Sequence, residues 1–169
     1  MKKIFISLVS LLVFTSCVLH VYRFTSVNYN NSRISISAGL VNSEDEKSPV
    51  EYIGVSDVRS NVNTPHKVKI LSSTIKIIDS NNKEYIAKTN SNSGYIHIYK
   101  QGVIITDDFK AYRGKVQLDD GRIIDIPPLS FKKTVYVERY SVISDTINAG
   151  GRGKEIFSGT VEDYKKQKK

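Results

Sequence analysis

The sequence predicts an all-β fold: an antiparallel β-sandwich of two sheets with about eight strands, with a small β-barrel as the second alternative. Short runs of alternating apolar and polar residues carry this prediction, because successive residues of a strand face opposite sides of a sheet. Clusters of Gly, Pro, Asn and Asp separate these runs about every 8–14 residues, which is typical of turns. The length of 169 residues fits one domain.

The first predicted strand covers residues 33–40, where isoleucine, alanine and leucine occupy every second position. An acidic run with a proline at 43–49 ends it, and residues 50–58 form the next strand. In residues 67–79 the hydrophobic parity changes near 71–73. One extra residue there returns the apolar side chains to a single face, so we expect a β-bulge.

The clearest hairpin is predicted at residues 110–127. A two-residue turn would pair Val116 with Asp125. A three-residue loop at 119–121 pairs Val116 with Ile124 instead, so the hydrophobic pattern selects this loop, with its glycine in the left-handed conformation.

Other alternating runs predict strands at 83–88, 95–99, 103–106, 131–143 and 156–161. Near the C-terminus, Thr160 is placed to cap a short helix, because Asp163 follows three residues later.

The N-terminus has the pattern of a secretory signal peptide. Lys2 and Lys3 precede an uncharged run at 4–14, and small polar residues follow. The next residue, Cys17, is the only cysteine, which excludes an intrachain disulfide framework.

The motif Phe14-Thr15-Ser16-Cys17 resembles the signal of bacterial lipoproteins. This resemblance implies that the signal is removed before Cys17, and that Cys17 becomes acylated, with palmitate or a similar chain, and anchors the protein to membrane lipid. Val18 in the next position implies sorting to the outer membrane rather than the inner one. Residues 4–22 form 19 uncharged positions, close to the ~20 of a membrane-spanning helix, so an uncleaved signal anchor is an alternative, and a cleaved soluble protein is a third.

The predicted organisation has four parts: a signal peptide at 1–16, the lipidated cysteine and a polar tether at 17–32, the sandwich domain at 33–161, and a basic tail at 162–169. The formal net charge of +8 is concentrated at the two ends, because residues 18–164 hold 19 basic and 17 acidic side chains. A nearly neutral body without a dense basic stripe disfavours nucleic-acid binding.

No catalytic, metal or cofactor site is predicted. His20, His66 and His97 are dispersed in the sequence, and His97 shares a parity with neighbouring tyrosines, as an ordinary sheet residue does. The acidic pairs at 107–108 and 119–120 are typical of turns. The glycine-rich segment 149–154 lacks the Ser or Thr that follows the lysine of a phosphate-binding loop.

Arg152 and Lys154 in this glycine-rich segment are the predicted contacts for a partner, since loops on a rigid sheet commonly carry binding function. We therefore expect a non-catalytic protein-binding module, lipid-anchored in the bacterial cell envelope and facing the periplasm. Its specific form would be an immunity-type lipoprotein that neutralises a toxin acting there. The alternatives are an accessory lipoprotein of a secretion or surface-assembly machine, an envelope hydrolase, and a carrier of lipids or small ligands.

Overall fold

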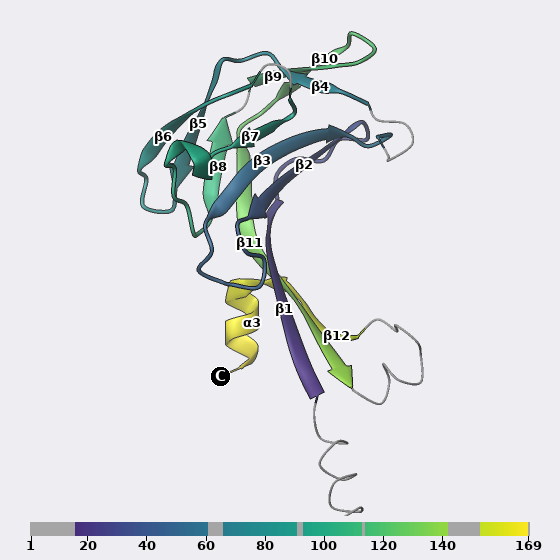
Figure 1. Cartoon of the computed structure of the whole chain (residues 1–169), viewed down its shortest axis with the longest axis vertical. Helices are drawn as coiled ribbons and strands as arrows, with labels where there is room; N and C mark the ends of the chain where they lie inside the picture. Colours follow the sequence, from purple (N-terminus) through teal and green to yellow (C-terminus); the bar gives the residue numbers. More distant parts are fainter. Residues whose placement is uncertain (1–15, 61–65, 91–92, 113, 142–152, 169) are drawn as a thin grey trace, which may run out of the picture. The chain divides into compact units, whose positions relative to one another are not determined.

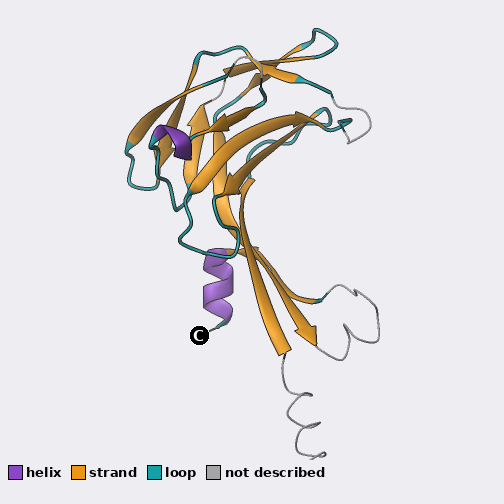
Figure 2. Cartoon of the chain, in the orientation of Figure 1, coloured by secondary structure: helices purple, strands orange, loops and turns teal. Residues whose placement is uncertain are grey.

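A computed structural model describes residues 16–60, 66–90, 93–112, 114–141 and 153–168. These residues form twelve β-strands, a short 3-10 helix η1 (Tyr99–Gln101) and a helix α3 (Val161–Gln167), as Figures 1 and 2 show. The predicted all-β, antiparallel fold is therefore confirmed. No helix in the described part of the chain is long and apolar enough to cross a bilayer.

The strands belong to two sheets. The larger sheet has the order β6-β5-β8-β11-β1-β2-β3-β7, with β12 also paired to β11, and the smaller has the order β10-β9-β4. The larger sheet contains β1 (Ser16–Ser26), β2 (Ile34–Leu40), β3 (Val50–Asp57), β5 (Thr74–Asp79), β6 (Glu84–Lys88), β7 (Tyr95–His97), β8 (Phe109–Tyr112), β11 (Leu129–Ser141) and β12 (Lys154–Thr160). The smaller sheet contains β4 (Val68–Ile70), β9 (Gly114–Leu118) and β10 (Ile123–Ile126).

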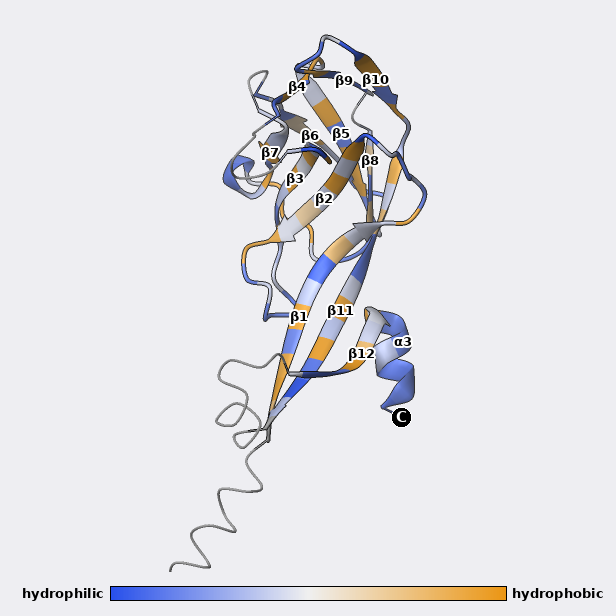
Figure 3. Cartoon of the chain, turned by 90° about the vertical axis from the view of Figure 1, so that its right-hand side faces the viewer, coloured by the Kyte–Doolittle hydropathy of each residue, from blue (hydrophilic) through white to orange (hydrophobic). Residues whose placement is uncertain are grey.

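The chain divides into two compact units, to both of which β1 and β11 contribute residues. The larger unit covers Arg23–Thr134, and its core consists of the inward side chains of both sheets. Phe109 stacks on Phe131 with ring centroids 4.6 Å apart, and Phe24 meets Phe109 edge-on at 5.2 Å. The bands of opposite hydropathy along β11 in Figure 3 show the alternation that buries one side of a strand.

One lysine is buried in the larger unit. The amine of Lys133 donates to the carbonyl oxygens of Glu46 and Thr106 and lies 5.3 Å from the centre of the Phe24 ring. The carbonyl oxygens and the ring face offer this charge the contacts that water would otherwise supply.

The smaller unit consists of the described residues within Met1–Tyr22 and Val135–Lys169. Its buried residues Val135, Val137 and Val161 pack with aromatic rings from β1, β12 and α3. Thr160 caps α3, as predicted, by accepting a hydrogen bond of 3.1 Å from the backbone of Asp163. Most of the predicted basic tail is therefore helical.

Two predicted continuous strands are in fact each divided between the sheets. Residues 67–79 contain no bulge: β4 pairs with β9 in the smaller sheet, whereas β5 pairs with β6 and β8 in the larger. The change of hydrophobic parity therefore marks a change of sheet at Leu71, which is exposed. β8 and β9 are divided in the same way, and Gly114 at the start of β9 has a φ of 72° that favours glycine.

Two other segments differ from the prediction. The expected tether covers residues 17–32, and its first part, up to Ser26, belongs to strand β1, which pairs with β2. Residues 103–106 form no strand, although Val103 and Ile105 are buried and Ile105 accepts a hydrogen bond from the backbone of Val50. Burial of alternate residues here does not require a sheet ladder.

The loop and register of the predicted hairpin are confirmed, but the hairpin consists of β9 and β10 alone, because β8 belongs to the other sheet. Val116 pairs with Ile124 in β9 and β10, and Gly121 in the loop has a φ of 83°. The three-residue loop places Asp119 and Asp120 at the tip of the hairpin, where both enter the charged cluster described next.

Candidate functional site

Two of the three residues predicted to act in anchoring and contact lie on strands. Cys17 is exposed near the start of β1, and Lys154 is exposed as the first residue of β12. Arg152 lies outside the described residues.

A cluster of charged side chains joins the end of β3 to the tip of the β9–β10 hairpin. We call it the aspartate–arginine corner. Its members are Arg33, Asp57, Arg59, His66, Asp119, Asp120 and Arg122. Ligand atoms of Asp57, His66 and Asp119 lie within 4.8 Å of one another, so this cluster has donors that suit a metal ion.

Arginines already engage these carboxylates. The side chain of Asp57 is fully buried, and it accepts hydrogen bonds from Arg59 Nε at 3.1 Å and Nη2 at 2.9 Å and from the Arg59 backbone. Arg33 Nε lies 3.4 Å from the same carboxylate. Arg59 also reaches Asp119 at 3.3 Å, and His66 pairs with Asp119. A cation would have to displace guanidinium groups, so the geometry favours a structural ion-pair network over a metal centre.

Asp120 completes the corner at the hairpin tip. Its carboxylate accepts hydrogen bonds from Arg122 at 2.7 Å and Arg33 at 2.8 Å. These two bonds hold the pKa of Asp120 well below its usual range. The loop that the hydrophobic pattern selected thus supplies the acceptor that ties the hairpin to Arg33, the residue directly before β2.

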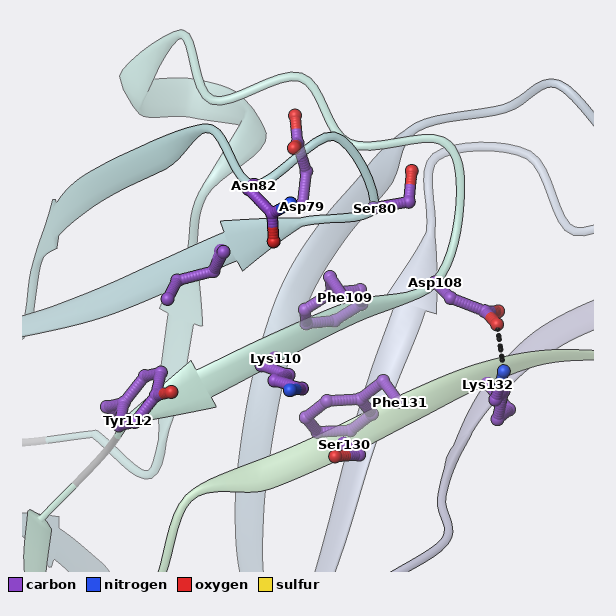
Figure 4. Close-up of a pocket in the computed structure, with 11 residues that line it drawn as sticks. Asp79, Ser80, Asn82, Asp108, Phe109, Lys110, Tyr112, Ser130, Phe131 and Lys132 are labelled. Carbon is purple, nitrogen blue, oxygen red and sulfur yellow. Dashed lines mark ion pairs between the residues drawn. The ribbon is translucent and has the colours of Figure 1, made fainter.

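A pocket of about 300 Å³ lies along β8 and β11 (Figure 4). The stacked rings of Phe109 and Phe131 line it, and Asp108 pairs with Lys132 at 2.7 Å on one side. Asp79 on another side accepts hydrogen bonds within its own turn, chiefly from the backbone of Lys83, which lower its pKa. These acidic groups are engaged within the protein, so they do not converge on a common point in the pocket.

The outer face of β2, β3 and β7 carries a different set of side chains. Registers of the three strands place Gly39, Tyr52 and His97 in one row, and Ser37, Gly54 and Tyr95 in the next. We call this surface the tyrosine–serine face. It consists of Ser35, Ser37, Gly39, Tyr52, Gly54, Ser56, Tyr95 and His97.

Glycines allow the rings of this face to lie flat on the sheet. The Tyr52 ring covers Gly39, and the Tyr95 ring covers Gly54 so closely that a Cβ atom there would lie 2.6 Å from the ring. The Tyr52 ring centroid lies 5.4 Å from that of Tyr95 and 6.1 Å from that of His97. Tyr95 remains 42% exposed, so the aromatic group is packed on one side and open to solvent on the other.

Sequence reasoning missed the tyrosine–serine face as a site. It placed Tyr95 and His97 on one side of a strand, which is confirmed, and interpreted them as ordinary sheet residues. The missing information was register, because only the pairing of β2, β3 and β7 brings Tyr52 and the two glycines beside them.

The chain matches no family model, no curated protein and no solved structure.

Proposed function

We propose that the protein is a non-catalytic protein-binding module, attached to the bacterial cell envelope through acylated Cys17 and facing the periplasm. The observation that carries the binding part is the tyrosine–serine face. We further propose that its partner is a protein toxin, which makes the chain an immunity-type lipoprotein.

The composition of the face supports protein recognition. Tyrosine supplies a large contact area with few rotatable bonds, and serine and glycine supply small groups that adapt to a partner; antibody paratopes use the same residue types. Tyrosine is also enriched where interfaces concentrate their binding free energy. The face lies on three paired strands, so little conformational freedom is lost when a partner binds.

The aspartate–arginine corner supports the non-catalytic part of the proposal. Asp57, Asp119 and Asp120 each contact arginine, so these carboxylates are engaged within the protein rather than free to act on a substrate. The position proposed for attachment is accessible, because Cys17 is exposed.

Capture of a partner from envelope extract tests the binding proposal. We expect the immobilised full chain to retain one protein, and the double variant Tyr52→Ser/Tyr95→Ser to lose it. The matched control is Tyr112→Ser, which removes an exposed tyrosine that lines the pocket of Figure 4. Loss with Tyr112→Ser and retention with the double variant would move the binding site to that pocket.

Attachment has its own test. Cells fed radiolabelled palmitate should label the wild-type chain and not Cys17→Ser. Labelling of both proteins, or of neither, contradicts acylation at Cys17. Sensitivity of a deletion strain to a toxin from sister cells tests the immunity role, and impaired surface assembly without sensitivity would favour an accessory role instead.

A further inference from the structure

A second pocket, of about 440 Å³, adjoins the tyrosine–serine face where β6 ends and β7 begins. It shares Tyr95 and His97 with that face. The described residues that line it are Lys88, Thr89, Asn90, Ser93, Tyr95, Ile96, His97, Lys100 and Gln101.

The lining has one sign of charge. Lys88 and Lys100 line the pocket, and neither forms an ion pair with any described residue; no acidic residue is among the described residues of the lining. His97 is the third basic group, and its Nδ1 pairs with a carboxylate oxygen of Glu51 at 4.0 Å. The two lysines at this concave site that lack an ion pair with a described residue favour an anionic ligand.

The pocket also lies along a free strand edge. β3 and β7 are paired so that Val55 donates to Gly94, which puts the polar backbone groups of Ile96 toward β3 and those of Tyr95 and His97 away from it. Two of these four groups are satisfied locally, because Ser93 Oγ accepts from Tyr95 N–H and Gln101 Nε2 donates to His97 C=O. The His97 N–H and Tyr95 C=O remain on the pocket side.

The side chain of Gln101 lies between the outer edges of β6 and β7 and forms the hydrogen bonds that a strand residue would form there. The Gln101 amide accepts from Lys88 N–H at 2.7 Å and donates to Lys88 C=O at 2.9 Å, and it also donates to His97 C=O at 3.2 Å. The backbone of Lys88 points away from β5, so the amide bridges the outer edges of β6 and β7. The gap between these edges is therefore wide enough for one amide group.

We propose that this pocket receives a carboxylate of the protein partner, bound by Lys88, Lys100 and His97, while an extended segment of the partner pairs with the His97 N–H and Tyr95 C=O. This mode of binding adds a strand to a sheet edge: the main chain supplies affinity and the pocket supplies specificity. The carboxylate belongs to an acidic side chain or to the C-terminus of the partner. The inference rests on the proposed protein-binding function and names the chemistry of the partner.

Short peptides test the inference without the partner. Backbone amide spectra of the full ¹⁵N-labelled chain in detergent micelles would be recorded with three peptides. The acidic peptide is acetyl-Thr-Glu-Thr-Glu-Thr-amide. The other two have Gln in place of Glu, one with the blocked C-terminus and one with a free C-terminal carboxylate. We expect the His97 and Gln101 amides to shift with the acidic peptide, with the free-carboxylate peptide, or with both, and not with the blocked neutral peptide. Which one binds identifies the source of the carboxylate.

The charge variants decide whether the pocket is responsible. Lys88→Gln/Lys100→Gln should weaken peptide binding about five- to tenfold, which is the loss expected for two solvent-accessible ion pairs. Lys67→Gln/Lys69→Gln changes the net charge equally on and beside β4 and should weaken it less than twofold. Equal losses in the two variants, or shifts spread over exposed lysines elsewhere, would overturn the inference.

The outcome is separable from that of the proposed function. If Tyr52→Ser/Tyr95→Ser abolishes partner capture while Lys88→Gln/Lys100→Gln leaves the peptide affinity unchanged, the face binds the partner and the pocket assignment is wrong. If the peptides bind as expected but Tyr52→Ser/Tyr95→Ser captures the partner as well as the wild type does, the proposed function of the face is wrong. The pocket is then a carboxylate site with another role.

Discussion

The aspartate–arginine corner and the tyrosine–serine face share strand β3 but lie on its opposite sides. The side chains of Tyr52 and Ser56 lie on the outer side, whereas those of Ile53, Val55 and Asp57 are buried. At the corner, nearly every charged group contacts an opposite charge within the protein. On the face, rings and hydroxyl groups remain open to solvent.

This difference separates stabilising polar groups from binding ones. A buried carboxylate is tolerated only where donors replace its lost water, so the Asp57 network belongs to the fold. Rings and hydroxyl groups that remain exposed to solvent contribute little to stability and can contact a partner. Removal of a charged group at the corner should therefore change stability, and removal of a tyrosine ring from the face should change binding.

The largest effect is expected for Asp57→Asn. It removes the buried charge that faces Arg33 and Arg59, and we expect the free energy of unfolding to fall by about 3 kcal/mol. Urea denaturation measures this change. Ser56→Ala, the adjacent outward residue, is the matched control and should stay within about 0.5 kcal/mol of wild type. A loss below about 1 kcal/mol in Asp57→Asn would break the comparison.

Gly54→Ala tests the close fit of the face. The new methyl group would meet the Tyr95 ring at 2.6 Å and Ser37 Oγ at 3.2 Å, so the ring must move. We expect the free energy of unfolding to fall by about 1.5 kcal/mol and capture of the partner to weaken. Ser35→Ala, on the same face but away from the ring, serves as control. Unchanged capture by Gly54→Ala would show that the ring position is irrelevant to binding.

Thr160→Ala removes a satisfied polar group from the smaller unit. Loss of the cap on α3 should lower the free energy of unfolding by about 1 kcal/mol. Thr160→Ser retains the acceptor and should restore most of the stability. Partner capture should be the same in all three proteins, and a defect in Thr160→Ala alone would extend the binding site to the smaller unit.

The smallest effect is a pH dependence at Asp120. Arg122 and Arg33 lower its folded pKa below the unfolded value of about 3.9, so its contribution is complete above that value and is lost as the pH falls through the folded pKa. The difference in unfolding free energy between wild type and Asp120→Asn should be constant above about pH 5 and shrink below about pH 4. Urea midpoints at several pH values measure it, and a difference that grows in acid would contradict the assigned ion pairs.

Local patterns predicted the parts of the fold that local physics decides. The hairpin loop followed from the parity of Val116 and Ile124, and the cap of α3 from the spacing of Thr160 and Asp163. The alternation in residues 67–79 was also read correctly, but a parity change has the same appearance whether a strand bulges or passes to another sheet.

The candidate sites depend on contacts between distant segments. Asp119 was interpreted as a turn residue, which is true, yet its contact with Arg59 spans 60 positions and has no signature in sequence. Tyr52 and Tyr95 likewise meet only because β7 pairs with β3 rather than with its sequence neighbour β6. The local pattern of a single sequence does not determine which strands become neighbours in a sheet.

The dissociation constant of the captured partner, measured by calorimetry for the wild type and for Tyr52→Ser/Tyr95→Ser, tests the central claim most directly. Two interface tyrosines should account for a loss of about 100-fold in affinity, with the urea midpoint of the variant close to that of the wild type. An unchanged dissociation constant in the folded variant would contradict the assignment of the tyrosine–serine face as the binding surface.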